Sequence, residues 1–128
     1  MTGKRQKAEA RGRRAEKWAA LWLMFKGYRI VSMREKTSSG ELDIVARKGG
    51  ILAIVEVKAR DTLEGGIHAL TWHQQQRIIR GTASFIGRRR QYAGLAIRYD
   101  LVVIRPWRAP SHMRQVFWPE GRSSQDFN

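Results

Sequence analysis

The 128-residue chain contains no cysteine, only three prolines and fewer than half as many acidic as basic residues. Without cysteine it can form neither disulfides nor thiolate metal sites, which suits a reducing compartment. No apolar run approaches the roughly 20 residues needed to span a bilayer. The basic N-terminus is not followed by the apolar core of a signal peptide. These absences predict a soluble, cytoplasmic protein without a membrane segment.

The most pronounced feature of the composition is its excess of positive charge. The chain has 25 Lys and Arg against 11 Asp and Glu, a formal net charge of +14. Self-repulsion in so small a domain is relieved by a polyanionic partner. The basic residues are spread along the chain and are mostly arginine, which binds phosphate in a bidentate manner. A charge that serves only solubility is the plainer alternative, but we expect a nucleic-acid partner, most readily DNA.

An amphipathic helix is expected over about residues 7–26, with Gly27 as its C-cap. Its apolar residues recur at helical spacing and predict one stripe that faces the core: Ala15, Trp18, Leu21, Trp22 and Phe25. On such a stripe Trp18 and Trp22 are core anchors rather than platforms for stacking bases.

Strands and one further helix are predicted for the rest of the chain. Thr71 is the expected N-cap of that helix, which runs to about Gly87. The other expected elements are strands at 28–33, 41–47, 51–60, 96–105 and 114–119, with polar loops at 34–40 and 61–66. The fold class is therefore α/β, a single domain over residues 1–128 with a mixed sheet flanked by helices. A basic N-terminal arm at about 1–7 and a flexible C-terminal tail at about 120–128 complete the prediction.

The glycine pair Gly49-Gly50 fixes the register of a hairpin between the second and third strands. Folded as a type I′ turn, it places Lys48 opposite Ile51. The same register sets Asp43 opposite Glu56, and Glu41 opposite Lys58.

Opposed carboxylates destabilise a sheet unless a proton or a cation lies between them. A divalent metal such as Mg²⁺, or Mn²⁺, would relieve the repulsion between Asp43 and Glu56. The alternative is a solvent-facing edge hairpin in which Lys58 and Arg60 are the counter-ions.

The same residues resemble a known motif. Asp43 followed by Glu56-Val57-Lys58 is similar to the D…ExK signature of the restriction-endonuclease-like, or PD-(D/E)xK, superfamily, and the order αβββαβ resembles its core. Over roughly residues 8–105 the chain more closely resembles the YraN-like family of uncharacterised proteins. That resemblance rests on Gly12, Glu16, Gly27-Tyr28, Gly40 to Asp43, Val55 to Lys58, Arg60 and Arg98 to Asp100. The family is predicted to contain endonucleases distantly related to archaeal Holliday junction resolvases.

The resemblance implies a Mg²⁺- or Mn²⁺-dependent endonuclease acting on DNA, branched or otherwise non-duplex DNA included. Asp43 and Glu56 would bind the metal, with the Val57 carbonyl and Glu16 as further ligands. Lys58 would orient the attacking water and stabilise negative charge, and Glu41 would assist Lys58 or the metal. Residues expected to contact nucleic acid are Arg11, Arg13, Arg14, Arg60, His73, Gln74, Arg77 and Arg80.

Several alternatives stay open at this point. Glu16 has a plainer interpretation as the partner of Arg13 or Lys17 in a surface salt bridge. Where the family usually has a lysine early in the second helix, this chain has glutamines at 74–76, which favours a non-catalytic nucleic-acid-binding module. An adaptor for an acidic protein is a third hypothesis. Junction resolution would need a two-fold homodimer, and the sequence leaves the oligomeric state open.

Two further interpretations concern residues outside the motif. The three histidines are scattered along the sequence, so a zinc site is not expected. Asp100, on a late strand, is expected to be structural and to pair with a nearby arginine.

Overall fold

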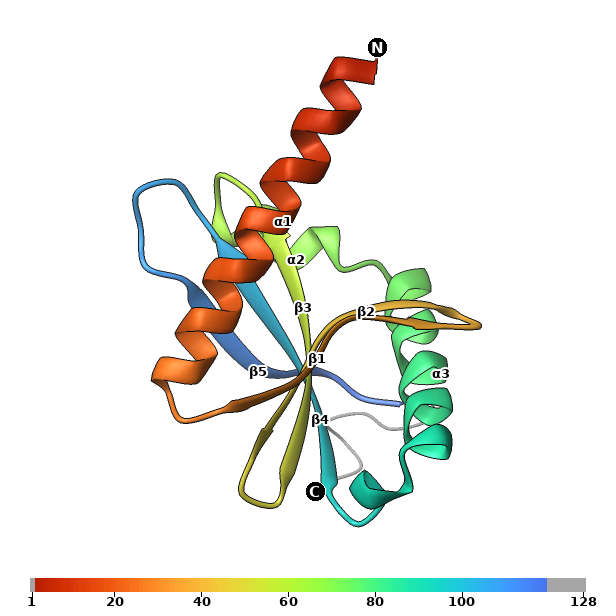
Figure 1. Ribbon diagram of the computed structural model, residues 1–128. Coiled ribbons are helices and arrows are strands. Elements are labelled where there is room, and N and C mark those ends of the chain that lie inside the picture. The colour runs from red at the N-terminus through yellow and green to blue at the C-terminus, as the bar shows by residue number, and fades with distance from the viewer. Residues whose placement is uncertain (1, 120–128) are drawn as a thin grey trace, which may run out of the picture.

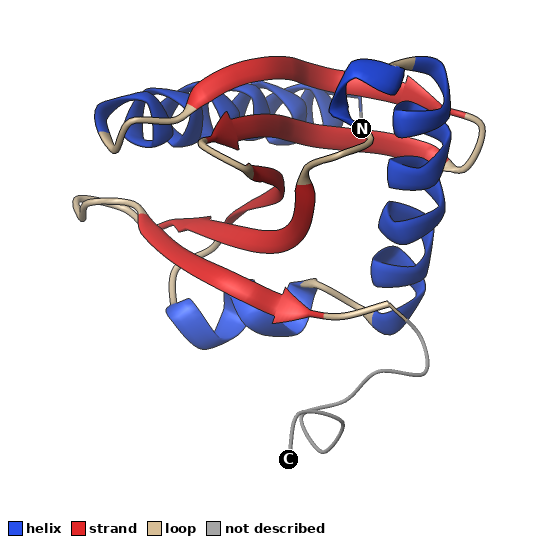
Figure 2. Ribbon diagram, turned by 90° about the horizontal axis from the view of Figure 1, so that it is seen from below, coloured by secondary structure: helices blue, strands red, loops and turns tan. Residues whose placement is uncertain are grey.

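A five-stranded mixed sheet lies at the centre of the computed structural model, which describes residues 2–119 (Figures 1 and 2). The elements in chain order are α1 (Thr2–Phe25), β1 (Arg29–Thr37), β2 (Gly40–Lys48), β3 (Ile51–Ala59), α2 (Leu63–Ala69), α3 (Trp72–Arg88), a 3₁₀ turn (Arg90–Tyr92), β4 (Ala96–Ile104) and β5 (Ser111–Phe117). The strands lie in the order β1-β2-β3-β4-β5. Only β3 and β4 are parallel. The expected α/β class and αβββαβ core are confirmed, and β5 corresponds to the further strand expected near the C-terminal end, whereas α2 was not expected.

Helices cover both faces of the sheet. Helix α1 packs on one face, where small residues of the sheet such as Ala46 and Ala53 contribute to the core. Helices α2 and α3 cover the other face, over a core that includes Leu52, Ile54 and Phe85. No helix in the described part of the chain has the length and apolarity that a membrane crossing requires.

Helix α1 begins earlier than expected, and a different side of the helix faces the sheet. It starts at Thr2, so residues 2–7 of the predicted arm are helical, and its N-terminal end projects beyond the sheet (Figure 1). Its buried side consists of Ala15, Ala19, Ala20 and Leu23. The prediction that Trp18 is a core anchor is wrong, because Trp18 is 59% exposed, and Trp22 is only half-buried. Alanine lets the helix axis approach the sheet closely, which an indole at the same position would prevent.

Glycines set the end of α1 and the position of α2. Gly27 has φ +96°, a conformation that favours glycine, and the predicted C-cap is confirmed. Residues 63–66 of the segment expected to be a loop at 61–66 instead begin α2, which is capped by Thr62, whose hydroxyl accepts from the Gly65 N–H at 3.0 Å. A Cβ on Gly66 would lie 2.5 Å from Val103 Cγ2, so the absence of a side chain allows α2 to pack on β4.

The remaining elements differ from expectation mainly in length. Thr71 caps α3 as predicted, accepting from the Gln74 N–H at 3.2 Å. Strand β1 continues through most of the expected loop at 34–40 and reaches Thr37. Strand β5 begins at Ser111, before the expected position. The predicted tail at 120–128 lies outside the described residues.

Candidate active site

The predicted register of the β2–β3 hairpin is confirmed for the part of the two strands that is next to the turn. Partners run from Lys48 and Ile51 at the turn to Ile44 and Val55, as the glycine pair predicted. Of the two turn glycines, only Gly49 has a positive φ, +58°, which is the φ pattern of a type II′ turn rather than type I′. Both turns have two-residue loops, so the register is the same.

Beyond Ile44 and Val55 the two strands separate into a fork. Strand β2 continues beside β1 and curves away, whereas β3 continues in parallel with β4 (Figure 1). Neither Asp43 with Glu56 nor Glu41 with Lys58 is therefore a pair of the ladder, which corrects the expected opposition of these residues. The candidate site lies in this fork.

Asp43 occupies the fork where the backbone of β2 no longer reaches β3. Its Oδ2 accepts a hydrogen bond from the Val57 N–H at 2.9 Å, in place of a ladder partner. The Asp43 side chain thereby satisfies a strand N–H group that would otherwise be buried without a partner. This bond fixes Asp43 against β3, directly beside Glu56.

Glu56 is the most unusual charged residue of the fold. It is 2% exposed, its Oε2 accepts from Gln74 Nε2 at 3.3 Å, and its Oε1 has no hydrogen-bond partner among the described residues. Burial, and then the neighbouring Asp43 carboxylate, raise the pKa of Glu56 well above its usual range, while Lys58 opposes this shift. A hydrogen bond between the Glu56 and Asp43 carboxyl groups also raises the pKa of Glu56, so Glu56 keeps its proton to a higher pH than an isolated glutamate would. A buried carboxyl oxygen without a partner is costly unless something binds it.

Helix α1 brings a third carboxylate toward the fork. Glu16 is half-buried and accepts from Arg34 Nε at 2.7 Å. Burial raises the pKa of Glu16, the Arg34 hydrogen bond lowers it, and the charges of Asp43 and Glu41 raise it further. Glu16, Asp43 and Glu41 are therefore close enough to repel one another.

The partner of Glu16 differs from both sequence-based candidates. Arg13 instead lies 3.8 Å from Glu9, and the Glu16 side chain binds Arg34. Arg34 has φ +53°, a strained conformation for a side chain of its size. Sequence analysis missed Arg34 because it lies in a segment that was expected to be a polar loop, and no local pattern marks it.

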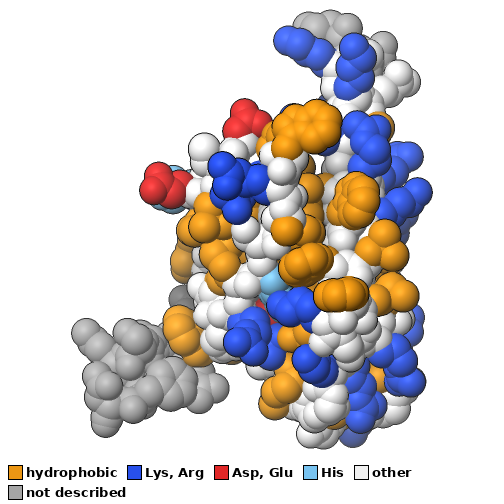
Figure 3. All heavy atoms as spheres, turned by 90° about the vertical axis from the view of Figure 1, so that its left-hand side faces the viewer, with side chains coloured by type: hydrophobic (Ala, Val, Ile, Leu, Met, Phe, Trp, Pro, Cys, Tyr) orange, Lys and Arg blue, Asp and Glu red, His pale blue; other side chains and the backbone are white. Residues whose placement is uncertain are grey.

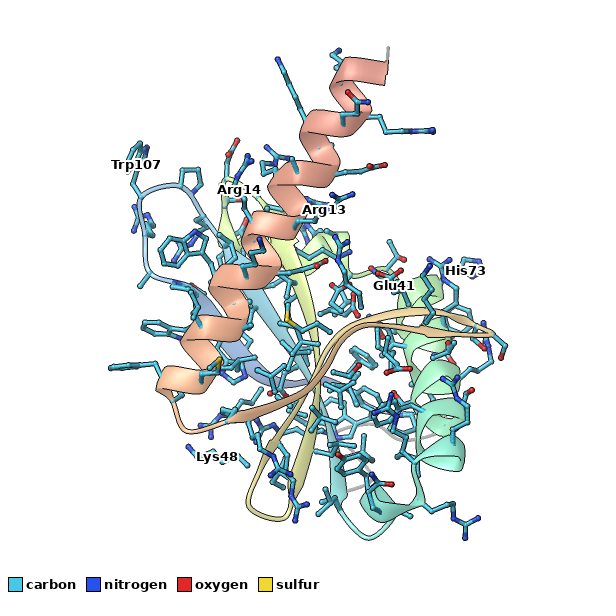
Figure 4. All side chains as sticks on the ribbon, in the orientation of Figure 1. Arg13, Arg14, Glu41, Lys48, His73 and Trp107 are labelled. Carbon is cyan, nitrogen blue, oxygen red and sulfur yellow. The ribbon has the colours of Figure 1, made fainter. Side chains whose placement is uncertain are left out.

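The structure brings together most of the predicted catalytic residues but divides the predicted nucleic-acid contacts. Half-buried Lys58 follows Glu56 on β3, and exposed Glu41 lies on the curved end of β2, on the side of the molecule where His73 begins α3 (Figure 4). Of the predicted nucleic-acid contacts, one group is on α3, namely His73, Gln74, Arg77 and Arg80, and a second group borders α1 and the end of β3, namely Arg11, Arg13, Arg14 and Arg60. Gln74 contacts Glu56 directly, so it belongs to the fork itself.

The fork is suited to a hard divalent cation that takes only a few of its ligands from the protein. Within residues 2–119 no three His, Asp or Glu side chains are grouped as a metal site. Mg²⁺, however, is commonly held by one or two carboxylates and keeps several waters. Asp43 and Glu56 supply oxygen ligands, and the unpartnered Oε1 of Glu56 is an acceptor without a donor. The donor set is therefore compatible with Mg²⁺ or Mn²⁺, and it lacks the nitrogen or sulfur ligands that a zinc site prefers.

Fold and fork together define a small α/β protein whose mixed sheet opens at a half-buried aspartate, Asp43, beside a buried glutamate, Glu56. The chain belongs to the uncharacterised protein family UPF0102, whose model matches residues 15–104. It is similar to a UPF0102 protein of Bartonella bacilliformis, with 44% identity over 113 residues, 88% of this chain and 93% of the relative. A UPF0102 protein of Rhizobium meliloti is 48% identical over 111 residues, 87% and 91% of the two chains. The expected YraN-like family is thus confirmed, and because the family is uncharacterised, membership assigns no activity.

Proposed function

We propose that the protein is a divalent-metal-dependent endonuclease that hydrolyses phosphodiester bonds of DNA. The observation that supports this most directly is buried Glu56, with an unpartnered carboxyl oxygen, next to half-buried Asp43 and Lys58 in a protein of net charge +14. A site built only for packing would not retain this arrangement, since the buried carboxyl group is costly. A cation and a phosphate offset that cost.

The residues of the fork have separate roles in this proposal. Asp43 and Glu56 would hold Mg²⁺ or Mn²⁺, with the Val57 carbonyl and Glu16 as further candidate ligands. The cation supplies Lewis-acid polarisation of a phosphate oxygen and makes water a stronger nucleophile at neutral pH. The Val57 N–H fixes the orientation of Asp43 through its Oδ2 atom.

Lys58 and Arg34 provide the positive charge of the fork. The Lys58 ammonium would hold the attacking water by a hydrogen bond and stabilise the negative charge that develops on the phosphate. Arg34 orients Glu16 through the 2.7 Å bond and limits the repulsion between Glu16 and Asp43. Glu41, exposed at the rim, is a candidate partner for Lys58 or for the cation.

Cleavage of defined DNA substrates tests the proposal. Purified protein is incubated with labelled duplex, single-stranded and four-way-junction DNA in Mg²⁺, Mn²⁺ or EDTA, alongside Asp43→Asn and Lys58→Ala. We expect cleavage that requires the metal and falls by at least about a hundredfold in both variants. Cleavage that persists in both variants would identify a contaminating nuclease, and DNA binding without cleavage in any condition would refute the catalytic role.

One observation favours a second function, a non-catalytic nucleic-acid-binding module with the same fold. Where the family resemblance implies a lysine early in this helix, the chain has glutamines at 74–76, and the amide of Gln74 donates to Glu56 Oε2 at 3.3 Å. A neutral amide stabilises the protonated or ionised carboxyl group without supplying charge to a phosphate. The module predicts DNA binding that is unchanged by EDTA, with no cleavage by the wild type.

A further inference from the structure

A second surface, on the opposite side of α1 from Glu16, has the composition of a binding site. The outward stripe of α1 and the loop between β4 and β5 form a mostly apolar groove. We call it the aromatic groove, and its aromatic residues are Trp18, Trp22, Phe25 and Trp107. Hydrophobic side chains gather on this side of the molecule with Lys and Arg side chains around them (Figure 3). Exposed apolar patches of this kind mark interaction sites.

Three of the four aromatic side chains are presented to solvent, and Trp22 is half-buried. Phe25 is 84% exposed, Trp18 is 59% exposed and Trp107 is completely exposed. Trp107 is held at the tip of the β4–β5 loop with φ +60°, a strained conformation for a bulky residue. The fold thus holds an indole outward at an energetic cost, which local packing does not explain.

The aromatic groove adjoins a hollow rich in arginine. We call this the arginine hollow, and its basic residues are Arg11, Arg14, Arg60 and Arg105. The two share Trp18, Ile104, Arg105 and Pro106 in their walls, so they form one continuous depression. Among the described residues no ion pair involves any of these four arginines, and Arg105 Nε is buried without a hydrogen-bond partner. Asp61 is the one acidic residue in the walls of the hollow, as far as the described residues show.

The arginine hollow connects this surface to the candidate active site. Its wall includes Ala59 and Arg60, the two residues that follow Lys58 along the chain. Arg14 lies on the side of α1 that faces the β4–β5 loop and Trp107, whereas Glu41 and His73 lie across the molecule (Figure 4). A bound polymer that leaves the fork past Lys58 would therefore meet the arginines first and the aromatic side chains next.

We propose that the arginine hollow and the aromatic groove bind a single-stranded segment of nucleic acid, with phosphates on the arginines and bases stacked on Trp18 and Trp107. Aromatic platforms beside a positively charged track are the common design of proteins that bind single strands without sequence preference. This inference rests on the proposed function, because it assigns the site a substrate with a single-stranded arm beside the scissile bond.

Charge argues against the other occupants. A second copy of this chain would bring the same arginines and a further net charge of +14 to the contact. A protein partner would have to supply several carboxylates at matching positions. A single strand provides regularly spaced phosphates and, at each nucleotide, a base that every exposed ring can stack on.

Binding in EDTA tests the inference independently of catalysis. The affinity for labelled oligothymidylate of about 20 nucleotides is measured by fluorescence anisotropy at about 0.1 M salt. We expect Trp107→Ala and Trp18→Ala each to weaken single-strand binding by about tenfold, with blunt-duplex binding nearly unchanged. Trp107→Phe, which retains a ring, should recover most of the affinity.

Trp72→Ala is the matched control. Trp72 and Trp18 are both 59% exposed, but Trp72 lies on α3, away from the aromatic groove. Equal weakening by Trp72→Ala, or no effect of the groove variants, would overturn the inference. So would groove variants that affect only self-association in sedimentation, or only binding to phosphatidylserine vesicles, since these outcomes assign the groove to a second copy or to a membrane. Loss of cleavage with intact groove-dependent binding would refute the proposed function alone, whereas metal-dependent cleavage without groove-dependent binding would refute the inference alone.

Discussion

At the scale of single residues, the fork depends on what surrounds each carboxyl group. Asp43 is oriented by a backbone N–H, Glu16 by a guanidinium and Glu56 by an amide, and one oxygen of Glu56 has no partner in the described structure. Three carboxyl groups of the same chemistry thus have three environments. Gln74 is the neutral partner of Glu56, and a single substitution can give it a positive charge.

Gln74→Lys tests the contribution of that partner. A lysine at this position would place an ammonium group near Glu56 and near a phosphate in the fork. We expect the cleavage rate in Mg²⁺ to rise several-fold, about 1 kcal/mol of transition-state stabilisation. Gln76→Lys, which adds the same charge to the same helix but has no described contact with Glu56, should change the rate little. An equal gain in both variants would show that the effect is general electrostatic attraction of DNA.

Asp100 is a second buried carboxylate, and its role is structural. It is completely buried and binds Arg98 at 2.7 Å and His112 at 2.8 Å, which confirms the expected arginine partner. Burial raises the pKa of Asp100, but the bonds from His112, Arg98 and the Gln115 N–H outweigh it and leave the pKa below its ordinary value. The pKa is thus lower in the folded protein than in the unfolded chain.

This shift predicts how stability depends on pH. Ionised Asp100 stabilises the fold fully above about pH 4, the ordinary pKa of aspartate, and the contribution is lost as the pH falls through the folded pKa. Asp100→Asn should lower the free energy of unfolding at pH 7 by about 3 kcal/mol, and less in progressively stronger acid. Urea unfolding from pH 7 down to pH values below 4 measures this, with exposed Asp61→Asn as the control. A difference that stays constant across this range would contradict the account.

At the scale of elements, close packing of helices on the sheet positions both sides of the fork. Helix α1 approaches through alanines and α2 through Gly66, whose added Cβ would lie 2.5 and 2.7 Å from the two methyl carbons of Val103. Gly66→Ala should destabilise the protein by about 1–3 kcal/mol through overpacking. Gly12→Ala, in α1 with nothing within 4 Å, should be neutral or stabilise by up to about 1 kcal/mol. Thermal unfolding compares them, and similar melting temperatures for both variants would refute the packing argument.

Local signals in the sequence predicted the elements that local chemistry determines. Thr71 begins α3, Gly27 ends α1, and the Gly49-Gly50 turn sets the register as far as Ile44 and Val55. In each case the residues that form the cap or the turn lie within a few positions of the structure that they determine. The pair Asp43 and Glu56 was found for the same reason, since the turn brings both strands together.

Features that depend on distant contacts were not predictable in this way. Helix α1 has two apolar stripes, and the periodicity of its large residues pointed to the exposed one, because bulky aromatic side chains outweigh alanine in hydrophobicity. Which stripe is buried depends on the alanines that the sheet presents. The fork is likewise a tertiary feature: β1 draws β2 away from β3, and this is why Arg34 joins Glu16 and why Glu41 does not face Lys58 in the ladder.

At the scale of the whole molecule, the net charge of +14 would govern the affinity for nucleic acid that the proposed function requires. Each arginine that neutralises a phosphate releases a counterion, so the logarithm of the binding constant falls linearly with the logarithm of the salt concentration. We expect Arg60→Gln and Arg14→Gln each to reduce the slope by about 1 for DNA with a single-stranded arm. Arg13→Gln, whose side chain pairs with Glu9, should change it less. Equal slopes for all three variants would show that the arginine hollow makes no specific contribution.

The central claim is that the Asp43–Glu56 pair uses a divalent cation to cut DNA. The most direct measurement is the cleavage rate of one labelled DNA as a function of Mg²⁺ concentration, for the wild type, Asp43→Asn and Glu56→Gln. The account predicts a rate that saturates with Mg²⁺ in the wild type and is at least about a hundredfold lower in both variants, with DNA affinity preserved. A wild-type protein that binds the DNA and shows no Mg²⁺-dependent cleavage, or variants that cut as fast as the wild type, would contradict it.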